Sequence, residues 1–126
     1  MKKVAELISL KGSAALITGA TGNIGQEVAL TIAELGGNLI LVDRPGSNYD
    51  QIRENVLDNW NVNVKCIDCD LENHNSRINL IEEIVKNNVN LDILINNAAF
   101  VGESNLEGWV EDFDKQSLET WNRALE

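Results

Sequence analysis

Residue types that mark whole classes of proteins are scarce in this 126-residue sequence. Two cysteines are too few for a disulfide framework, which favours a reducing compartment. No apolar run is longer than four residues, the length of the run at positions 39–42, which is far shorter than the roughly 18 residues of a membrane-spanning helix. The first residues lack the apolar segment of a secretory signal. The sequence therefore predicts a cytoplasmic protein.

Positive charge is also in short supply. Ten lysines and arginines stand against twenty acidic residues, which gives a net charge of −10. A surface of this sign repels phosphate backbones and anionic lipid, so we expect neither nucleic acid nor a membrane as a partner. One bound dinucleotide remains compatible with this charge, because backbone N–H groups can hold phosphates locally. The acids of residues 101–126 are interpreted as a solvated face.

The few metal-binding residue types do not form a metal site in the sequence. Cys66 and Cys69 have the spacing of a zinc or redox pair, but His74, the single histidine, raises the ligand count only to three. A redox pair opens a helix, whereas Cys66 lies near the end of the strand-like run 62–67. We interpret the cysteines as core or strand-end residues and His74 as an exposed residue at a helix start.

Short apolar runs alternate with amphipathic stretches along the chain. The composition, 44% hydrophobic and 24% charged, fits one globular domain over residues 1–126. Strands are predicted at 14–18, 39–42, 62–67 and 91–95. Four helices are predicted. The apolar residues that indicate them are Ile24, Val28, Ile32 and Leu35 on one face of the first; Tyr49, Ile52, Val56 and Trp60 on one side of the second, after a cap at Ser47; Ile78, Ile81 and Val85 on the inner face of the third, at 75–87; and Leu118, Trp121 and Leu125 in the fourth, from Ser117.

Strands that are apolar on both faces and alternate with helices predict parallel β-α-β units. Right-handed crossovers then give an α/β, Rossmann-like doubly wound sheet with strand order 3-2-1-4. The pattern stops before a fifth strand, so we expect an incomplete domain. The fourth strand would then lie at an open sheet edge, and the chain alone is expected to self-associate.

A glycine-rich turn links the first predicted strand to its helix. Thr18-Gly19-Ala20-Thr21-Gly22-Asn23-Ile24-Gly25 contains three glycines. One allows a sharp turn, one lets backbone N–H groups reach a pyrophosphate, and one lets the helix lie close to the strand. The amino end of the helix adds partial positive charge. This pattern is typical of a dinucleotide-binding loop.

An acidic residue follows at the end of the second predicted strand. Asp43 lies eighteen residues after Gly25, where a carboxylate can accept hydrogen bonds from the adenine ribose and repel a 2′-phosphate. Arg44 could stack on adenine or weaken that discrimination. The alternative is that Asp43 only begins the turn before Pro45. We predict NAD as the cofactor, with NADP less favoured.

Together these motifs resemble the short-chain dehydrogenase/reductase family from about Leu10 onward. Asp70-Leu71 resembles its adenine-contacting pair, Asn96-Asn97-Ala98-Ala99 its Asn-Asn-Ala-Gly motif, and residues 117–121 the helix start before its catalytic asparagine. The cofactor-binding residues expected from the pattern and the resemblance are Gly19, Thr21, Gly22, Asn23, Ile24, Gly25, Asp43, Arg44, Asp70, Leu71, Asn97, Ala98 and Ala99.

Two features depart from the family pattern. The glycine spacing is that of the extended branch of epimerases and dehydratases, whereas the Asn-Asn-Ala motif is that of the classical branch. Ala99 replaces a glycine and adds a methyl group where the nicotinamide ribose would pass. The segments 97–102 and 107–110 also resemble reductases of bacterial surface-sugar and flagellin-glycan pathways.

The catalytic residues of the family are not recognised in this sequence. The resemblance implies a Tyr-x-x-x-Lys pair with a serine and an asparagine, but the single tyrosine, Tyr49, is followed four residues later by Arg53. We therefore expect these residues beyond Glu126 and no activity from the chain alone. The favoured function is cofactor binding in an NAD(P)-dependent, homo-oligomeric oxidoreductase acting on an alcohol or carbonyl substrate. The alternatives are a nucleotide-sugar epimerase or dehydratase and a non-catalytic dinucleotide-binding protein.

Overall fold

The computed structural model describes residues 4–87, 90–99 and 111–125, and their side chains except at 4–5 and 123–125. The elements in chain order are α1 (Val4–Leu7), β1 (Ala14–Thr18), α2 (Asn23–Glu34), β2 (Asn38–Asp43), α3 (Asp50–Asn59), β3 (Val64–Asp68), α4 (His74–Lys86), β4 (Ile93–Ile95), the 3₁₀ turn η1 (Phe113–Lys115) and α5 (Leu118–Leu125). The predicted alternation of strands and helices is confirmed.

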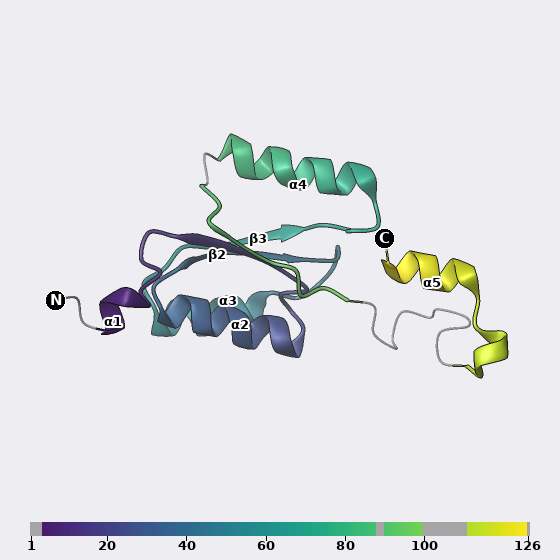
Figure 1. Ribbon diagram of the computed structural model, residues 1–126. Coiled ribbons are helices and arrows are strands. Elements are labelled where there is room, and N and C mark those ends of the chain that lie inside the picture. Colours follow the sequence, from purple (N-terminus) through teal and green to yellow (C-terminus); the bar gives the residue numbers. More distant parts are fainter. Residues whose placement is uncertain (1–3, 88–89, 100–110, 126) are drawn as a thin grey trace.

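The four strands form one parallel sheet in the order β3-β2-β1-β4 (Figure 1). Leu16 of β1 pairs with Ile40 of β2 on one side and with Leu94 of β4 on the other. The predicted fold, a Rossmann-like sheet with strand order 3-2-1-4, is therefore confirmed. Its central strand β1 is buried at all five positions, as its apolar sequence requires.

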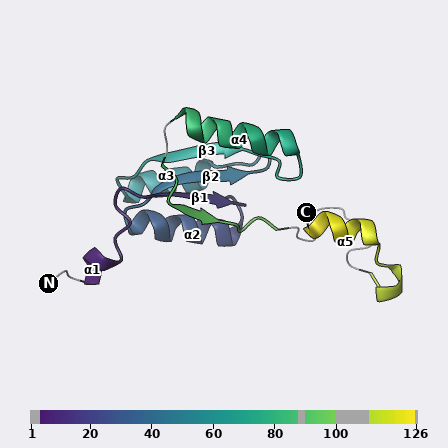
Figure 2. The same cartoon turned by 45° about the horizontal axis from the view of Figure 1, so that its top comes forward.

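Helices cover both faces of the sheet, with α2 and α3 on one face and α4 on the other (Figures 1 and 2). Alternate strand residues supply the two cores. Ile17, Leu39 and Leu41 pack on the α2 and α3 side with Ile52 and Val56. The core on the α4 side contains Leu16, Ile40, Val42, Ile67, Cys69 and Leu80.

The buried face of α2 differs from the predicted one. Its buried residues are Gly25, Ala29 and Ala33, whereas Ile24 is 71% exposed. Val28 and Ile32 are partly buried at the margin of this core. Small side chains allow the helix axis to approach the strands closely, so the larger apolar residues are displaced to its flank. The helix predicted from Ile24 is confirmed, but the face with Ile24 is not the one that packs on the sheet.

The predicted inner face of α4 was also wrong. Ile78, Ile81 and Val85 are all exposed, and the helix instead buries Leu80, with Ile84 packed beside it. Both sets repeat at helical spacing, and the sequence alone does not say which of them faces the sheet. The helix begins at the exposed His74, as expected.

Two helix starts illustrate how local polar groups set boundaries. The prediction that Ser47 caps α3 was wrong, because this helix begins at Asp50. The Asp50 backbone N–H donates to Asn48 Oδ1 at 2.8 Å. The start predicted at Ser117 is confirmed, since Ser117 Oγ accepts from the Thr120 backbone N–H at 3.1 Å.

Some segments were not anticipated or have different bounds. The sequence did not predict α1 or η1, and β4 is shorter than the apolar run 91–95. Residues 100–110 lie outside the described residues, and with them all of the surface-sugar resemblance except its part at 97–99. Within the described ranges, no helix has both the length and the apolar character needed to cross a bilayer.

Candidate functional site

The predicted site residues gather at the carboxyl edge of the sheet. Gly19 directly follows β1, Asp43 ends β2, Asp70 comes two residues after β3, and Asn97 comes two residues after β4. Strands β2 and β3 lie on one side of β1, and β4 lies on the other. The strand order therefore reverses at β1, and this reversal leaves a crevice at the carboxyl ends of β1 and β4. In open α/β sheets this crevice is where ligands bind.

Two of the three glycines have a structural need for glycine. Gly19 has a φ of +64°, and a Cβ there would come within 2.9 Å of Ala98 Cα. A Cβ on the buried Gly25 would overlap the Gly19 carbonyl oxygen and lie 2.9 Å from Ala20 Cα. The first glycine makes the turn and the third allows the helix to lie close to it.

Gly22 differs, because it is exposed and has room around it. A Cβ there would meet only the Gly19 carbonyl oxygen, at 3.4 Å, which is near ordinary van der Waals contact. Gly22 is therefore not needed to close the turn. Its missing side chain leaves the backbone of this loop open to solvent.

The amino end of α2 offers unpaired donors. Gly22 is the N-cap and no side-chain hydrogen bond from the described residues caps the helix. The first helical residues, Asn23 and Ile24, follow directly, and Gly25 completes the turn. The amino end of α4 differs, since Asn73 Oδ1 accepts from the Ser76 N–H at 3.0 Å. An uncapped helix start with no acid in its first turn can receive an anion.

Asp43 is fixed by the glycine loop. Its Oδ2 accepts from the Thr21 backbone N–H at 2.8 Å and from the Thr21 hydroxyl at 2.7 Å. Its Oδ1 accepts from the Arg44 backbone N–H at 2.8 Å. Partial burial alone would raise the pKa of Asp43, but the hydrogen bonds from Thr21, Arg44 and Ser47 outweigh it and lower the pKa. The carboxyl is thus held ionised.

Arg44 directly follows Asp43, and the Asp70-Leu71 pair follows β3 at the same edge of the sheet. The Arg44 residue is exposed. Asp70 is half-buried, with its Oδ1 accepting from the Glu72 N–H and its own N–H donating to Ser76 Oγ, both at 3.0 Å. Leu71 packs against the core on the α4 side. Asp70 therefore organises the turn before α4, whatever else it contacts.

Asn97 ties β4 to the glycine turn. Its Nδ2 donates to the carbonyl oxygens of Thr18, at 3.0 Å, and Gly19, at 3.1 Å. The backbone N–H groups of Asn97 and Ala98 both donate to the Thr18 hydroxyl at 3.1 Å. Ala98 and Ala99 are exposed beside this network. The two motifs, 78 residues apart at Gly19 and Asn97, thus form one structure.

Sequence reasoning gave Thr18 no role of its own, although it is 5% exposed and central to this network. Its hydroxyl also donates to the Ile95 carbonyl oxygen at 3.4 Å. Gln26 was missed as well, and its Nε2 donates to the Thr21 carbonyl oxygen at 2.7 Å. A threonine directly before the first glycine was the available signal for Thr18; no comparable signal marks Gln26.

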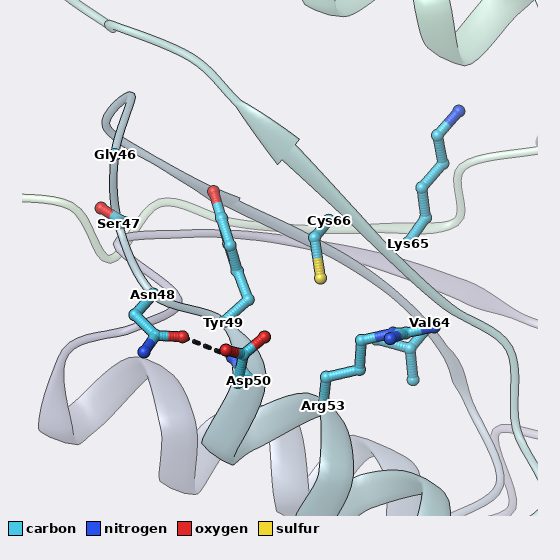
Figure 3. A pocket seen from close by; sticks show the side chains of 9 residues that line it. All are labelled: Gly46, Ser47, Asn48, Tyr49, Asp50, Arg53, Val64, Lys65 and Cys66. Carbon is cyan, nitrogen blue, oxygen red and sulfur yellow. Dashed lines mark hydrogen bonds between the residues drawn. The ribbon is translucent and has the colours of Figure 1, made fainter.

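Tyr49 lies in a separate groove between the start of α3 and β3 (Figure 3). Its hydroxyl donates to the Ile67 carbonyl oxygen at 3.0 Å, and burial raises its pKa. Arg53 and Cys66 also line the groove, but no residue of the glycine loop does. Tyr49 thus packs at the start of α3, in agreement with its interpretation as a packing residue.

The cysteines are part of the sheet and its core. Cys66 is half-buried in β3, and burial raises the pKa of its thiol. Cys69 is buried on the α4 side, with the Ser76 hydroxyl 3.6 Å from its sulfur. Both thiols are free, and the described residues contain no cluster of three or more metal-ligating side chains.

Comparison with known proteins agrees with this geometry. The chain is 36% identical over 113 residues to a 3-oxoacyl-(acyl-carrier-protein) reductase of Rickettsia felis, covering 86% of this chain and 42% of that protein. The structure of an NADPH-dependent 3-quinuclidinone reductase from Rhodotorula rubra matches with a TM-score of 0.77 and 31% identity, covering 98% of this chain and 44% of that one.

A short-chain type dehydrogenase/reductase from Mycobacterium marinum matches with a TM-score of 0.82 and 25% identity, over 97% of this chain and 45% of that one. The chain thus spans less than half the length of these relatives. A family model described as short chain dehydrogenase matches residues 13–126. The chain belongs to the short-chain dehydrogenase/reductase family of oxidoreductases.

Proposed function

We propose that residues 1–126 form the dinucleotide-binding part of an NAD-preferring short-chain oxidoreductase. The observation that carries this proposal is the juxtaposition of two features at one sheet edge. The α2 amino end is open behind Gly22, and the ionised Asp43 is fixed against the same loop by Thr21. Phosphates and a ribose diol require this pair of features.

The residues present fit a dinucleotide. The backbone N–H groups at Asn23, Ile24 and Gly25 would receive the pyrophosphate, because Gly22 adds no side chain in front of them. Asp43 would accept from the adenine ribose, with Arg44, Asp70 and Leu71 around the adenine. Ala98 and Ala99 would border the nicotinamide ribose, where Asn97 holds the backbone.

When bound, the nicotinamide would supply or accept a hydride. The residues of this chain would only bind and orient it, since Tyr49 is committed to the Ile67 carbonyl. We place the proton-transfer residues in the remaining length of the relatives, which this chain does not span. The substrate would be an alcohol or carbonyl compound in the cytoplasm, and the whole protein a homo-oligomer.

The cofactor preference rests on Asp43. The related Rhodotorula reductase is NADPH-dependent. In this chain a carboxylate would meet the 2′ position, and its negative charge would repel a 2′-phosphate. Exposed Arg44 is the residue that could offset that repulsion. We propose that Asp43 dominates, because Thr21 holds its Oδ2 against the loop and the Arg44 backbone N–H holds its Oδ1.

Titration of the full-length protein with NADH and NADPH tests the proposal. We expect tighter binding of NADH, and a preference that shrinks or reverses in Asp43→Ala. Tighter binding of NADPH by the wild type would overturn the preference, and an Arg44→Ala variant would then show whether Arg44 holds the phosphate. Absence of binding to either dinucleotide would overturn the function itself.

The glycine spacing at 19, 22 and 25 favours one second candidate, an epimerase or dehydratase acting on a nucleotide sugar. Such an enzyme returns the hydride to its own substrate, so the bound cofactor shows no net turnover. Net oxidation of NADH with a carbonyl substrate supports the oxidoreductase, whereas sugar conversion without net oxidation supports the alternative.

A further inference from the structure

We infer that Thr21 is a specificity-determining residue, which positions Asp43 for the ribose of NAD. This inference rests on the proposed function and deepens it. Thr21 would contact no reacting atom; it acts through the carboxylate that it holds. The resemblance to the family suggested Thr21 only as part of the phosphate loop, and its pairing with Asp43 is a feature of the structure.

Thr21 and Asp43 are joined by two hydrogen bonds. Thr21 donates twice to the same oxygen, Asp43 Oδ2, from its backbone N–H at 2.8 Å and its hydroxyl at 2.7 Å. The partners are 22 residues apart, so the contact joins the β1–α2 turn to the end of β2. Both residues are half-buried, which protects these hydrogen bonds from competing water.

Thr21 is itself held in place. Gln26 Nε2 donates to the Thr21 carbonyl oxygen at 2.7 Å, from the first turns of α2. All three polar groups of Thr21 therefore have partners. Because the backbone of Thr21 is held by Gln26, the two donors of Thr21 point in fixed directions. They therefore hold the Asp43 carboxylate in one preferred orientation.

Counting acceptor sites shows what remains for a ligand. An ionised carboxylate has about four lone-pair sites. Thr21 uses two on Oδ2, the Arg44 N–H uses one on Oδ1, and the Ser47 side chain also hydrogen-bonds to this carboxyl. A ribose hydroxyl would therefore take the place of Ser47 at the carboxylate. An ionised carboxylate cannot donate, so the Thr21 hydroxyl must be the donor, and its own oxygen can still accept from a second ribose hydroxyl.

This arrangement would favour binding of NAD and also disfavour NADP. The two hydroxyls of a ribose diol would find two acceptors, the Asp43 carboxylate, where one hydroxyl displaces Ser47, and Thr21 Oγ. A 2′-phosphate is itself an acceptor and negatively charged, so it finds no donor in this pair. A freely rotating carboxylate could turn away from the phosphate, whereas the one held by Thr21 cannot.

The test compares Thr21→Val, Thr21→Ser and Thr31→Val in the full-length protein. Valine keeps the shape and the backbone N–H but removes the hydroxyl, and serine retains it. Thr31 on α2 is a matched control, because its hydroxyl donates to the Glu27 carbonyl oxygen at 2.9 Å, on the exposed side of the helix. Thr21→Ala serves as a second deletion if the valine variant is poorly folded.

For Thr21→Val we expect about tenfold weaker NADH binding without a parallel loss of NADPH binding. Thr21→Ser and Thr31→Val should bind as the wild type does. Equal losses for both dinucleotides would assign Thr21 a merely structural role and overturn the inference, as would a wild-type ratio of affinities in Thr21→Val.

A second readout needs no cofactor. Carbon-13 NMR titration of the Asp43 carboxyl should show a higher pKa in Thr21→Val than in the wild type, because one hydrogen bond to the ionised form is lost. An unchanged pKa would overturn the positioning role. If the wild type bound neither dinucleotide, the proposed function would fail, while this titration would still report whether Thr21 controls Asp43.

Discussion

Gly25 lies directly against Gly19, so that a Cβ on Gly25 would overlap the Gly19 carbonyl oxygen. We therefore expect Gly25→Ala to destabilise the fold by about 2 kcal/mol, the usual scale for forcing an extra carbon into a filled space. Urea unfolding followed by circular dichroism measures this. An alanine variant as stable as the wild type would mean that α2 can move away from the turn at no cost.

Gly22→Val should weaken dinucleotide binding and leave the stability of the fold unchanged. The open space at Gly22 leaves the fold intact, but a branched side chain would stand where the pyrophosphate approaches the helix. We expect an unfolding midpoint close to that of the wild type and dinucleotide binding weakened at least about tenfold. Unfolding of this variant would instead make Gly22 a residue of backbone geometry.

Thr18→Val should separate β4 from the glycine turn. The Thr18 hydroxyl accepts from the N–H groups of Asn97 and Ala98, and valine would leave both donors without this acceptor. We expect a loss of about 2 kcal/mol in the free energy of unfolding, measured by urea titration. Thr18→Ser restores the acceptor and should recover most of the loss; equal losses in both variants would contradict this explanation.

Asp43 should make stability depend on pH in acid. Its pKa is lower in the folded protein than the ordinary value of 3.8, so its contribution is fully present above that value. It is lost as the pH falls through the lowered pKa, where the folded state must take up the proton. Asp43→Asn should therefore be less stable than the wild type at pH 7, and the difference in the free energy of unfolding should narrow as the pH falls below 3.8. A constant gap would contradict the assignment.

A polypeptide limited to residues 1–126 should self-associate. Leu94 of β4 is 58% exposed, and among the described strands β4 pairs only with β1. Val85 on α4 is 67% exposed. Light scattering should show mass rising with concentration. Leu94→Lys should reduce this more than Val85→Lys, because β4 also presents unpaired backbone groups. A monomer at all concentrations would contradict the prediction.

The sheet was predictable from sequence because its strands are apolar on both faces, as at β1 and β2. The inward faces of the helices were less predictable. On α2, Ala29 and Ala33 are buried although Ile24 is more hydrophobic. Small side chains on the buried face let the helix lie closer to the strands, so hydrophobicity alone does not identify that face. On α4, the exposed stripe with Ile81 repeats as regularly as the buried one with Leu80.

In the candidate site, too, some residues were predictable from the sequence and their contacts were not. The glycine spacing and the acid at the end of β2 indicated Gly19 and Asp43 from local sequence, since Gly19 follows a strand and Asp43 ends one. The contacts of Thr21 with Asp43, and of Thr18 with Asn97, join residues 22 and 79 positions apart. Only the strand register brings these groups together, and a sequence pattern does not give hydroxyl directions.

The tie between Thr18 and Asn97 has a consequence for the order of synthesis. A ribosome makes the glycine loop first, yet the backbone donors that hold the Thr18 end of that loop come 79 and 80 residues later. Local helix formation can begin early, but this closure must wait for the late strand, as distant pairings in parallel sheets do. The nascent chain therefore carries a complete phosphate-loop sequence long before it has the finished loop.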